Sequence, residues 1–300
     1  MKLVKFLHTA DWQMGMKALG AGERAKQVRE RRYDAARKVV QLAKNEKVEF
    51  MVISGDLFEN HDVDETVVKR TVSILNEMAP LRVFVLPGNH DPLTPGSVWT
   101  RSSWSRRGNH ILLLEKAEEY ILSDGVALYP CPLRQKRSGL DPTDWIPTKE
   151  SADSRIRIGV AHGALRILPQ NINFPIAQDR AEICGLDYLA LGDWHGFSEY
   201  GKAVYSGTFE QTSFSERNAG KVLIVEIASS GGPRRITPIP IGTVRWLEVE
   251  HAIGGEADLK TLEAELRQLG SLKDSIIRLN TPVRSDLPRG CTEDLGRIVE

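Results

Sequence analysis

Short apolar runs that end abruptly on polar residues recur along the chain. Runs of this length are typical of β-strands, and they fall at residues 3–7, 50–53, 83–86, 155–160 and 187–191. Two longer segments, 23–47 and 63–78, repeat apolar residues at helical spacing and predict amphipathic helices between the first three strands. Strands that alternate with helices predict an α/β fold, in which binding sites form at the carboxyl ends of strands.

The polar residues that follow these strands are of the kinds that bind metals or move protons. Any one of them has an ordinary structural explanation, because aspartate and asparagine also cap helices and form turns. The whole series, in order along successive strand ends, favours a catalytic site over chance. Its members are Asp11, Gln13, Asp56, Asn89, His90, Asp91, His162, Asp193 and His195.

The segment 83–91 carries the densest group of these residues. Asn89 offers a carbonyl oxygen to a metal, and the imidazole of His90 can bind a metal or move a proton. The carboxylate of Asp91 can orient that imidazole. We therefore expect His90 and Asp91 to act in catalysis.

Five motifs, in order, resemble those of the calcineurin-like metallophosphoesterases. They read Asp-x-Gln, Gly-Asp, Gly-Asn-His-Asp, His-Gly and Gly-Asp-x-His, where the family form is Asp-x-His, Gly-Asp, Gly-Asn-His, His-Gly and Gly-His-x-His. Within that superfamily, residues 8–12 (His-Thr-Ala-Asp-Trp), 205–208 and 213–216 resemble the SbcD-type DNA repair nucleases. The resemblance implies a four-layer α/β/β/α metallophosphoesterase sandwich with a small C-terminal α/β cap.

The resemblance also implies a site with two divalent metal ions, about 3.5 to 4 Å apart, that hydrolyses phosphoesters. One ion would be held by Asp11, Gln13, Asp56 and His195, and the other by Asp56, Asn89, His162 and Asp193, with Asp56 bridging the pair. His90 stays free of metal in this assignment and would protonate the leaving alkoxide.

Gln13 and Asp193 depart from the family pattern, because both stand where it has histidine. Two nitrogen ligands thereby become oxygens, and an oxygen-rich set favours manganese over zinc. A neutral amide oxygen also binds a metal less tightly than an imidazole does. The substitution puts the occupancy of the Gln13 position in question.

Two segments are candidates for contacting nucleic acid. Residues 24–38 carry seven basic residues against two acidic ones, Arg31 and Arg32 among them; a phosphate-contacting face and a solvated helix face are equally consistent with this run. The second segment interleaves aromatics with arginines and can stack bases and bind phosphates, although tryptophans that anchor a long loop on the core explain it about as well. Its members are Trp99, Arg101, Trp104, Arg106 and Arg107.

Composition narrows these choices. Forty basic and forty acidic residues leave no net charge on 300 residues, so a polyanion must be met by local patches. The three cysteines lie far apart, which excludes a disulfide framework and a paired metal motif and fits a reducing compartment. No apolar stretch is long enough for a signal-peptide core or a membrane span. We therefore expect a cytoplasmic protein without membrane contact.

The chain is expected to divide near residue 242. Residues 1–242 form the catalytic domain, and segments 221–227, 234–240 and 244–250 are expected to close its second sheet. Residues 243–300 form a cap-like α/β domain with a helix at 256–269, a strand at 276–279 and a second helix at 292–300. The cap is expected to be incomplete, and no obligate ATPase partner, of the kind found in SbcCD-type complexes, is evident.

These features predict a binuclear-metal phosphodiesterase that hydrolyses DNA, specifically a manganese-dependent single-strand endonuclease in DNA repair. Three alternatives stay open. They are an exonuclease of SbcD type, a phosphodiesterase or phosphomonoesterase acting on small molecules, and a weakly active metal- and DNA-binding interaction protein.

Overall fold

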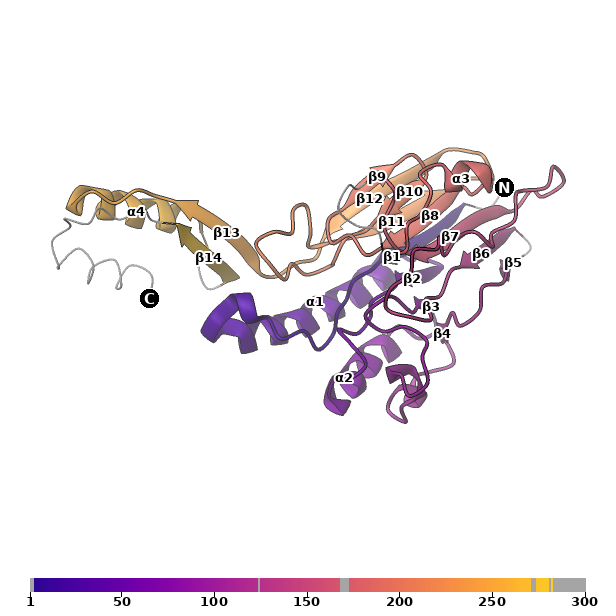
Figure 1. Ribbon diagram of the computed structural model, residues 1–300, viewed down its shortest axis with the longest axis horizontal. Helices are drawn as coiled ribbons and strands as arrows, with labels where there is room; N and C mark the ends of the chain where they lie inside the picture. Colours follow the sequence, from indigo (N-terminus) through magenta and orange to yellow (C-terminus); the bar gives the residue numbers. More distant parts are fainter. Residues whose placement is uncertain (1–2, 124, 168–172, 271–273, 281, 283–300) are drawn as a thin grey trace. The chain divides into compact units, whose positions relative to one another are not determined.

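The computed structural model describes residues 3–123, 125–167, 173–270, 274–280 and 282 (Figure 1). The chain divides into two compact units. The first comprises the residues up to Gln211 together with Glu216–Thr243, and the second comprises Thr212–Ser215 and the residues from Val244 onward. All of the predicted metal ligands belong to the first unit.

The first sheet of this unit has six strands in the order β12-β11-β1-β2-β3-β4. Strands β1 to β4 are parallel, whereas β11 runs antiparallel to β1 and β12 runs antiparallel to β11. Neighbouring residues of a strand point to opposite faces, so that Phe6 packs toward the second sheet and Leu7 toward the helices. The strands are β1 (Val4–Thr9), β2 (Phe50–Ser54), β3 (Arg82–Leu86), β4 (Ile111–Leu113), β11 (Lys221–Ile227) and β12 (Arg234–Pro240).

The second sheet also has six strands, in the order β5-β6-β7-β8-β10-β9. Its inner strands β6, β7, β8 and β10 are parallel, and β5 and β9 are antiparallel to their neighbours. The strands are β5 (Tyr120–Ser123), β6 (Val126–Pro130), β7 (Ile156–His162), β8 (Tyr188–Gly192), β9 (Ser198–Tyr200) and β10 (Ala203–Tyr205).

Helices α1 (Ala25–Asn45) and α2 (Glu65–Asn76) lie on the outer face of the first sheet (Figure 1). A large apolar core fills the space between these helices and the sheet. Asp64 caps α2 by accepting the N–H of Thr66. A second apolar core separates the two sheets. On the far face of the second sheet lie α3 (Arg180–Ile183), which is a single turn, and apolar loop residues. The predicted α/β fold with two packed sheets is confirmed.

Short 3-10 helices join these elements at Leu19–Arg24, Val98–Thr100 and Trp104–Arg106. Cys131 and Cys184 are buried and unpaired, and both donate to backbone carbonyls. No helix in the described ranges is long and apolar enough to cross a bilayer.

Our assignment of three late segments to the second sheet was wrong. Strands β11 and β12 extend the first sheet beside β1. Strand β11 is apolar on both faces, with Val222 packed toward the helices and Leu223 toward the second sheet, and a place beside β1 covers both. Strand β13 (Arg245–Glu250), in which Trp246 is the one buried residue, pairs with β14 (Ser275–Asn280) in the second unit.

The second unit is a small α/β unit in its own right. Strands β13 and β14 are parallel, and α4 (Glu256–Gln268) lies between them in the sequence. Leu259, Leu262 and Leu266 of α4 form its core with Ile253. The helix predicted at 292–300 falls outside the described residues.

Candidate metal centre

The predicted ligands lie at the carboxyl ends of strands from both sheets. Asp11 follows β1, Asp56 follows β2 and Asn89 follows β3, while His162 ends β7 and Asp193 follows β8. Four of the predicted ligands have positive φ angles, namely Asp11 (53°), Gln13 (40°), Asp56 (53°) and Asp193 (97°). Residues other than glycine adopt this conformation rarely, and such outliers concentrate at functional sites. The chain therefore adopts this uncommon conformation directly after β1, β2 and β8.

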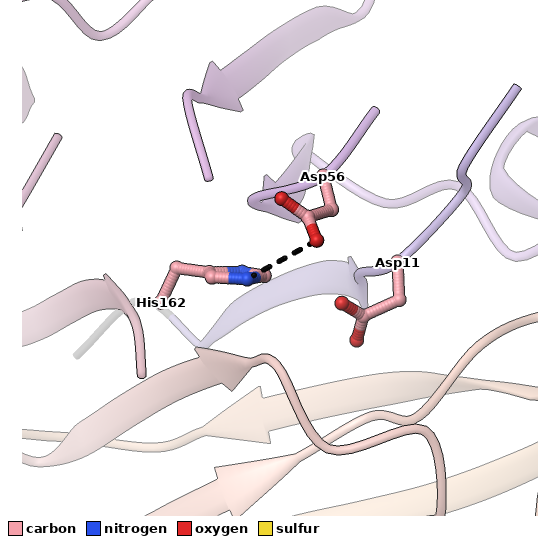
Figure 2. Close-up of side chains that lie close together, drawn as sticks. All are labelled: Asp11, Asp56 and His162. Carbon is pink, nitrogen blue, oxygen red and sulfur yellow. Dashed lines mark ion pairs between the residues drawn. The ribbon is translucent and has the colours of Figure 1, made fainter. Parts of the chain in front are cut away.

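His162 lies at the centre of the cluster of side chains that results, which is here called the metal pocket. Its Nε2 is 2.7 Å from Oδ1 of Asn89 and 3.4 Å from Oδ2 of Asp56. The same atom is 3.9 Å from Oδ1 of Asp193. Figure 2 shows the imidazole pointing at the Asp56 carboxylate, with Asp11 beside them; one ligand atom from each of Asp11, Asp56 and His162 lies within 4.8 Å of the others. These four predicted ligands of the second metal, Asp56, Asn89, His162 and Asp193, thus converge.

The orientation of the His162 ring follows from its other nitrogen. Nδ1 lies 2.9 Å from the carbonyl oxygen of Ser54, and because a carbonyl only accepts, Nδ1 carries the proton and donates it. Nε2 is then the atom available to a metal or to a second proton. Gly55 makes this approach possible, since a Cβ there would lie 2.0 Å from Nδ1 of His162.

The electrostatics of the pocket are those of a cation site. Burial raises the pKa of Asp11 to about 6, and burial also raises the pKa of Asp193. Burial would raise the pKa of Asp56 as well, but the charges of His162 and His90 hold it below its ordinary value. For His162, burial opposes the charge, yet Asp56, Asp11 and Asp193 raise its pKa well above 6.5. The carboxylates that raise this pKa would also attract a bound cation.

An unpartnered oxygen supports the same conclusion. Oδ2 of Asp11 is buried and has no hydrogen-bond partner among the described residues. A buried carboxylate oxygen is costly without a donor or a cation beside it. The oxygen-rich side chains of the pocket therefore fit a hard divalent metal.

The other predicted position has a different arrangement. Nε2 of His195 lies 3.2 Å from Nε2 of Gln13, and its Nδ1 lies 2.6 Å from Oε1 of Glu216. Burial opposes the charged form of His195, but the hydrogen bond to Glu216 raises its pKa to about 9. Glu216 belongs to the segment 213–216 that carried the resemblance, but a lone acidic residue gave no sign of this role in the sequence.

The predicted pairing of His90 with Asp91 was wrong. His90 donates from Nδ1 to the carbonyl oxygen of Glu59, 2.8 Å away, and its Nε2 faces Oδ2 of Asp56 at 4.0 Å. Asp91 is fully buried and accepts the backbone N–H groups of Phe58 and Gly88 instead. Burial raises the pKa of Asp91 to about 7. Asp91 therefore shapes the loop, whereas His90, whose side chain is 40% exposed, borders the pocket.

The sequence left two alternatives for the basic residues at 24–38, a phosphate-contacting face and a solvated helix face, and Arg32 fits neither because it is buried. It is 2% exposed and donates to the carbonyl oxygens of Trp12, Asp11 and Glu210. Its guanidinium thereby links the backbone of the loop after β1, at Asp11 and Trp12, to the backbone at Glu210. Arg31, which precedes Arg32 in α1, is half-buried, and its predicted contact with nucleic acid stays a prediction.

The segment of residues 99–107, here called the Trp–Arg segment, also differs from the prediction. Trp99 and Trp104 are buried with 6% and 0% exposure, and their rings pack on each other and on Phe58. Arg101 donates to the backbone carbonyls of His61 and Val63. The aromatic rings therefore anchor the loop and are not available to stack bases.

The remaining arginines of the Trp–Arg segment are closer to solvent. Arg107 lies over the Trp104 ring, with its guanidinium carbon 5.1 Å from the ring centroid, and Arg106 is exposed. The exposed tryptophan beside the predicted ligands is Trp194, between Asp193 and His195, at 46% exposure. No arginine lies in residues 190–199 around Trp194, so the interleaving of aromatics with arginines does not mark it in the sequence.

Two packed sheets whose strand ends share a buried pocket of carboxylate, amide and imidazole groups define a class of metal-dependent hydrolases. Residues 4–197 match the calcineurin-like phosphoesterase family, and the chain belongs to this family. The resemblance to this family that the sequence motifs predicted is thereby confirmed. Membership of the family implies a metal-dependent phosphoester hydrolase.

Similar proteins include two bacterial relatives and one solved structure. The chain is 23% identical to the uncharacterized metallophosphoesterase YhaO of Bacillus subtilis over 239 residues, which cover 75% of this chain and 57% of YhaO. It is 26% identical to the SbcD subunit of the nuclease SbcCD of Staphylococcus saprophyticus, with 92% of this chain and 81% of that protein covered. The calcineurin-like phosphoesterase YfkN from Bacillus subtilis is 12% identical, with a TM-score of 0.49, and the match covers 80% of this chain and 91% of YfkN.

Proposed function

We propose that this protein is a manganese-dependent phosphodiesterase that cuts DNA, and that it cuts single strands internally. The observation that carries the proposal is the convergence of Asp56, Asn89 and Asp193 on Nε2 of His162 in a buried pocket. Divalent metal in such a pocket supplies a nucleophilic water and neutralises charge on the phosphate.

The residues of the chain supply the rest of the chemistry. Asp56 presents Oδ2 to the pocket, while its Oδ1 accepts the backbone N–H of His90 at 2.9 Å. This bond fixes the start of the His90 loop beside the pocket. In its doubly protonated form His90 presents Nε2–H at the rim, donates that proton to the leaving oxygen of the ester and keeps the proton on Nδ1.

DNA is proposed as the substrate because of the relatives. One of them is named as a component of a nuclease, and the match covers most of both chains. The residues at 205–208 and 213–216 carry the same resemblance, and Glu216 there contacts His195.

Single-stranded DNA is proposed because the pocket is recessed. Asp11, Asp56 and His162 are 0% to 2% exposed, so a backbone must bend to reach them, and a single strand bends more easily than a duplex. Stacking by Trp99 and Trp104 no longer supports this preference. Trp194 takes that role in the proposal, because it is exposed and adjoins two predicted ligands.

Manganese is proposed from the kinds of ligand. Among the predicted ligands only His162 and His195 bring nitrogen, and three carboxylates bring oxygen. We expect activity with Mn²⁺ well above that with Zn²⁺ or Ca²⁺. A zinc optimum in a metal titration would disprove this choice of metal.

The test of the proposed function is cleavage of circular and linear DNA, single- and double-stranded, with the purified chain and Mn²⁺. We expect a covalently closed single-stranded circle to be cut and an intact duplex to be cut poorly. If the circle survives while linear strands are degraded from an end, the enzyme is an exonuclease. Faster hydrolysis of a phosphomonoester than of any DNA, or DNA binding without cleavage, would overturn the DNA phosphodiesterase assignment.

A further inference from the structure

The two metal positions implied by the fold differ in what their histidines face. Nε2 of His162 faces oxygen atoms of Asn89 and Asp56, which are groups that bind a metal. Nε2 of His195 faces the side-chain amide of Gln13 at 3.2 Å. The family pattern has histidine where this chain has Gln13, so the contact is a property of this chain.

The donors and acceptors of the two side chains define the contact between His195 and Gln13. The Glu216 carboxylate accepts from Nδ1 of His195 at 2.6 Å, so Nδ1 carries the proton and the neutral ring has its lone pair on Nε2. The Gln13 amide N–H donates to that lone pair. If the ring carries both protons, the amide must flip so that its oxygen Oε1 accepts from Nε2, and the nitrogen is again hydrogen-bonded to Gln13. In either case the nitrogen that would bind a metal is engaged by Gln13.

Asp11 indicates that a cation position exists there nevertheless. Its Oδ1 accepts the N–H of Asp193 at 3.2 Å, while its buried Oδ2 has no partner among the residues the structure describes. Asp11 and Asp56 therefore offer carboxylate oxygens to this position, but the imidazole of His195 is not open to it.

We infer that Gln13 makes the two metal positions unequal. The position of Asp56, Asn89, His162 and Asp193 fills first, and the position of Asp11 and His195 fills only at higher metal concentration, after the Gln13–His195 hydrogen bond breaks. The inference rests on the proposed metal-dependent function, and it makes the full two-metal site dependent on metal supply.

The test is calorimetric titration of the metal-stripped protein with Mn²⁺, which needs no substrate. The wild type should show one tight event and a second that is weaker by roughly 10- to 100-fold, the range typical of changes in the groups around a ligand. Gln13→His should tighten the second event by at least about tenfold. Gln41→His, on the exposed face of α1, is the matched control and should leave both events unchanged.

Gln13→Ala tests whether the Gln13 side chain blocks His195 or instead binds the metal. It also replaces Gln13→His as the test if that variant does not fold. A side chain that blocks His195 contributes nothing to holding the metal, so the weak event should stay or become tighter. Loss of the weak event in Gln13→Ala, or two equally tight events in the wild type, would overturn the inference. The DNA cleavage test above can fail independently, since it measures activity and this titration measures binding.

Discussion

The metal pocket and the Trp–Arg segment use their polar groups in different ways. In the pocket, carboxylates and imidazoles face one another, and Oδ2 of Asp11 is buried without a described partner. In the Trp–Arg segment, the indole N–H of Trp99 is bonded to the Asp91 carbonyl and Arg101 donates to two carbonyls, whereas the buried indole N–H of Trp104 has no partner among the described residues. Charged residues therefore mark a candidate cation site where several of them face one another, and not where each is bonded to backbone carbonyls.

Replacing Asp56 tests whether the carboxylates of the metal pocket are needed for hydrolysis. Asp56→Asn removes the carboxylate that lies 3.4 Å from His162 and that would bridge the metals. We expect phosphodiester hydrolysis to fall on the order of 10³-fold or more, beyond the 10- to 100-fold typical of residues behind the ligands. Circular dichroism should show an intact fold. Retained hydrolysis would remove Asp56 from the site.

Replacing His90 separates proton donation from metal binding. His90→Asn should slow cleavage of a nucleoside ester by about 10² to 10⁴, while calorimetry shows unchanged Mn²⁺ binding. A nitrophenyl ester has a better leaving group and needs less protonation, so the defect should be smaller with that substrate. Equal losses on both esters would mean that His90 orients the phosphate or binds metal.

Replacing Trp104 tests the opposite region. Trp104 is fully buried against Phe58 and Trp99, so Trp104→Ala should lower the free energy of unfolding by about 3–5 kcal/mol. Activity per folded molecule should hold at a temperature where the variant is folded. Urea unfolding together with DNA cleavage measures both quantities.

Trp194 provides the contrast within the same experiment. At 46% exposure, Trp194→Ala should change the free energy of unfolding by less than about 1 kcal/mol. It should instead weaken single-stranded DNA binding by about 1–3 kcal/mol, the value of one stacked base. If Trp104→Ala weakens DNA binding more than Trp194→Ala does, the assignment of the two tryptophans is reversed.

A smaller effect is expected from His8, a polar residue buried between the sheets. Its Nδ1 lies 2.9 Å from the Tyr188 hydroxyl, and burial lowers its pKa from 6.5 to about 3. The unfolded chain therefore takes up the proton first, and the contribution of His8 to stability is lost as the pH falls below about 6.5, by about 2 kcal/mol between pH 7 and pH 5.

Urea unfolding of the wild type and His8→Gln at both pH values checks this prediction. The stability advantage of the wild type should shrink by that amount on acidification. Because the comparison is between two variants at the same pH, the acids of the pocket cancel. An advantage that does not change with pH would mean that His8 titrates alike in the folded and unfolded chain.

The sequence was sufficient to predict most strands and the convergence of residues at their ends. Apolar runs such as β2 are buried throughout, and the parallel strands bring Asp11 and Asp56 to one edge. The sequence was insufficient where the partner of a side chain decides its role. Arg32 and Trp99 are bonded to backbone carbonyls, and only the folded chain shows which carbonyls lacked a donor.

We propose that the metal pocket is a metal-dependent phosphodiesterase site. Hydrolysis of bis(p-nitrophenyl) phosphate tests this proposal, with metal-stripped wild type and Asp56→Asn, before and after addition of Mn²⁺. We predict no turnover before the addition, turnover by the wild type after it, and none by Asp56→Asn at either stage. Turnover that survives metal removal, or that persists in Asp56→Asn, would contradict the claim.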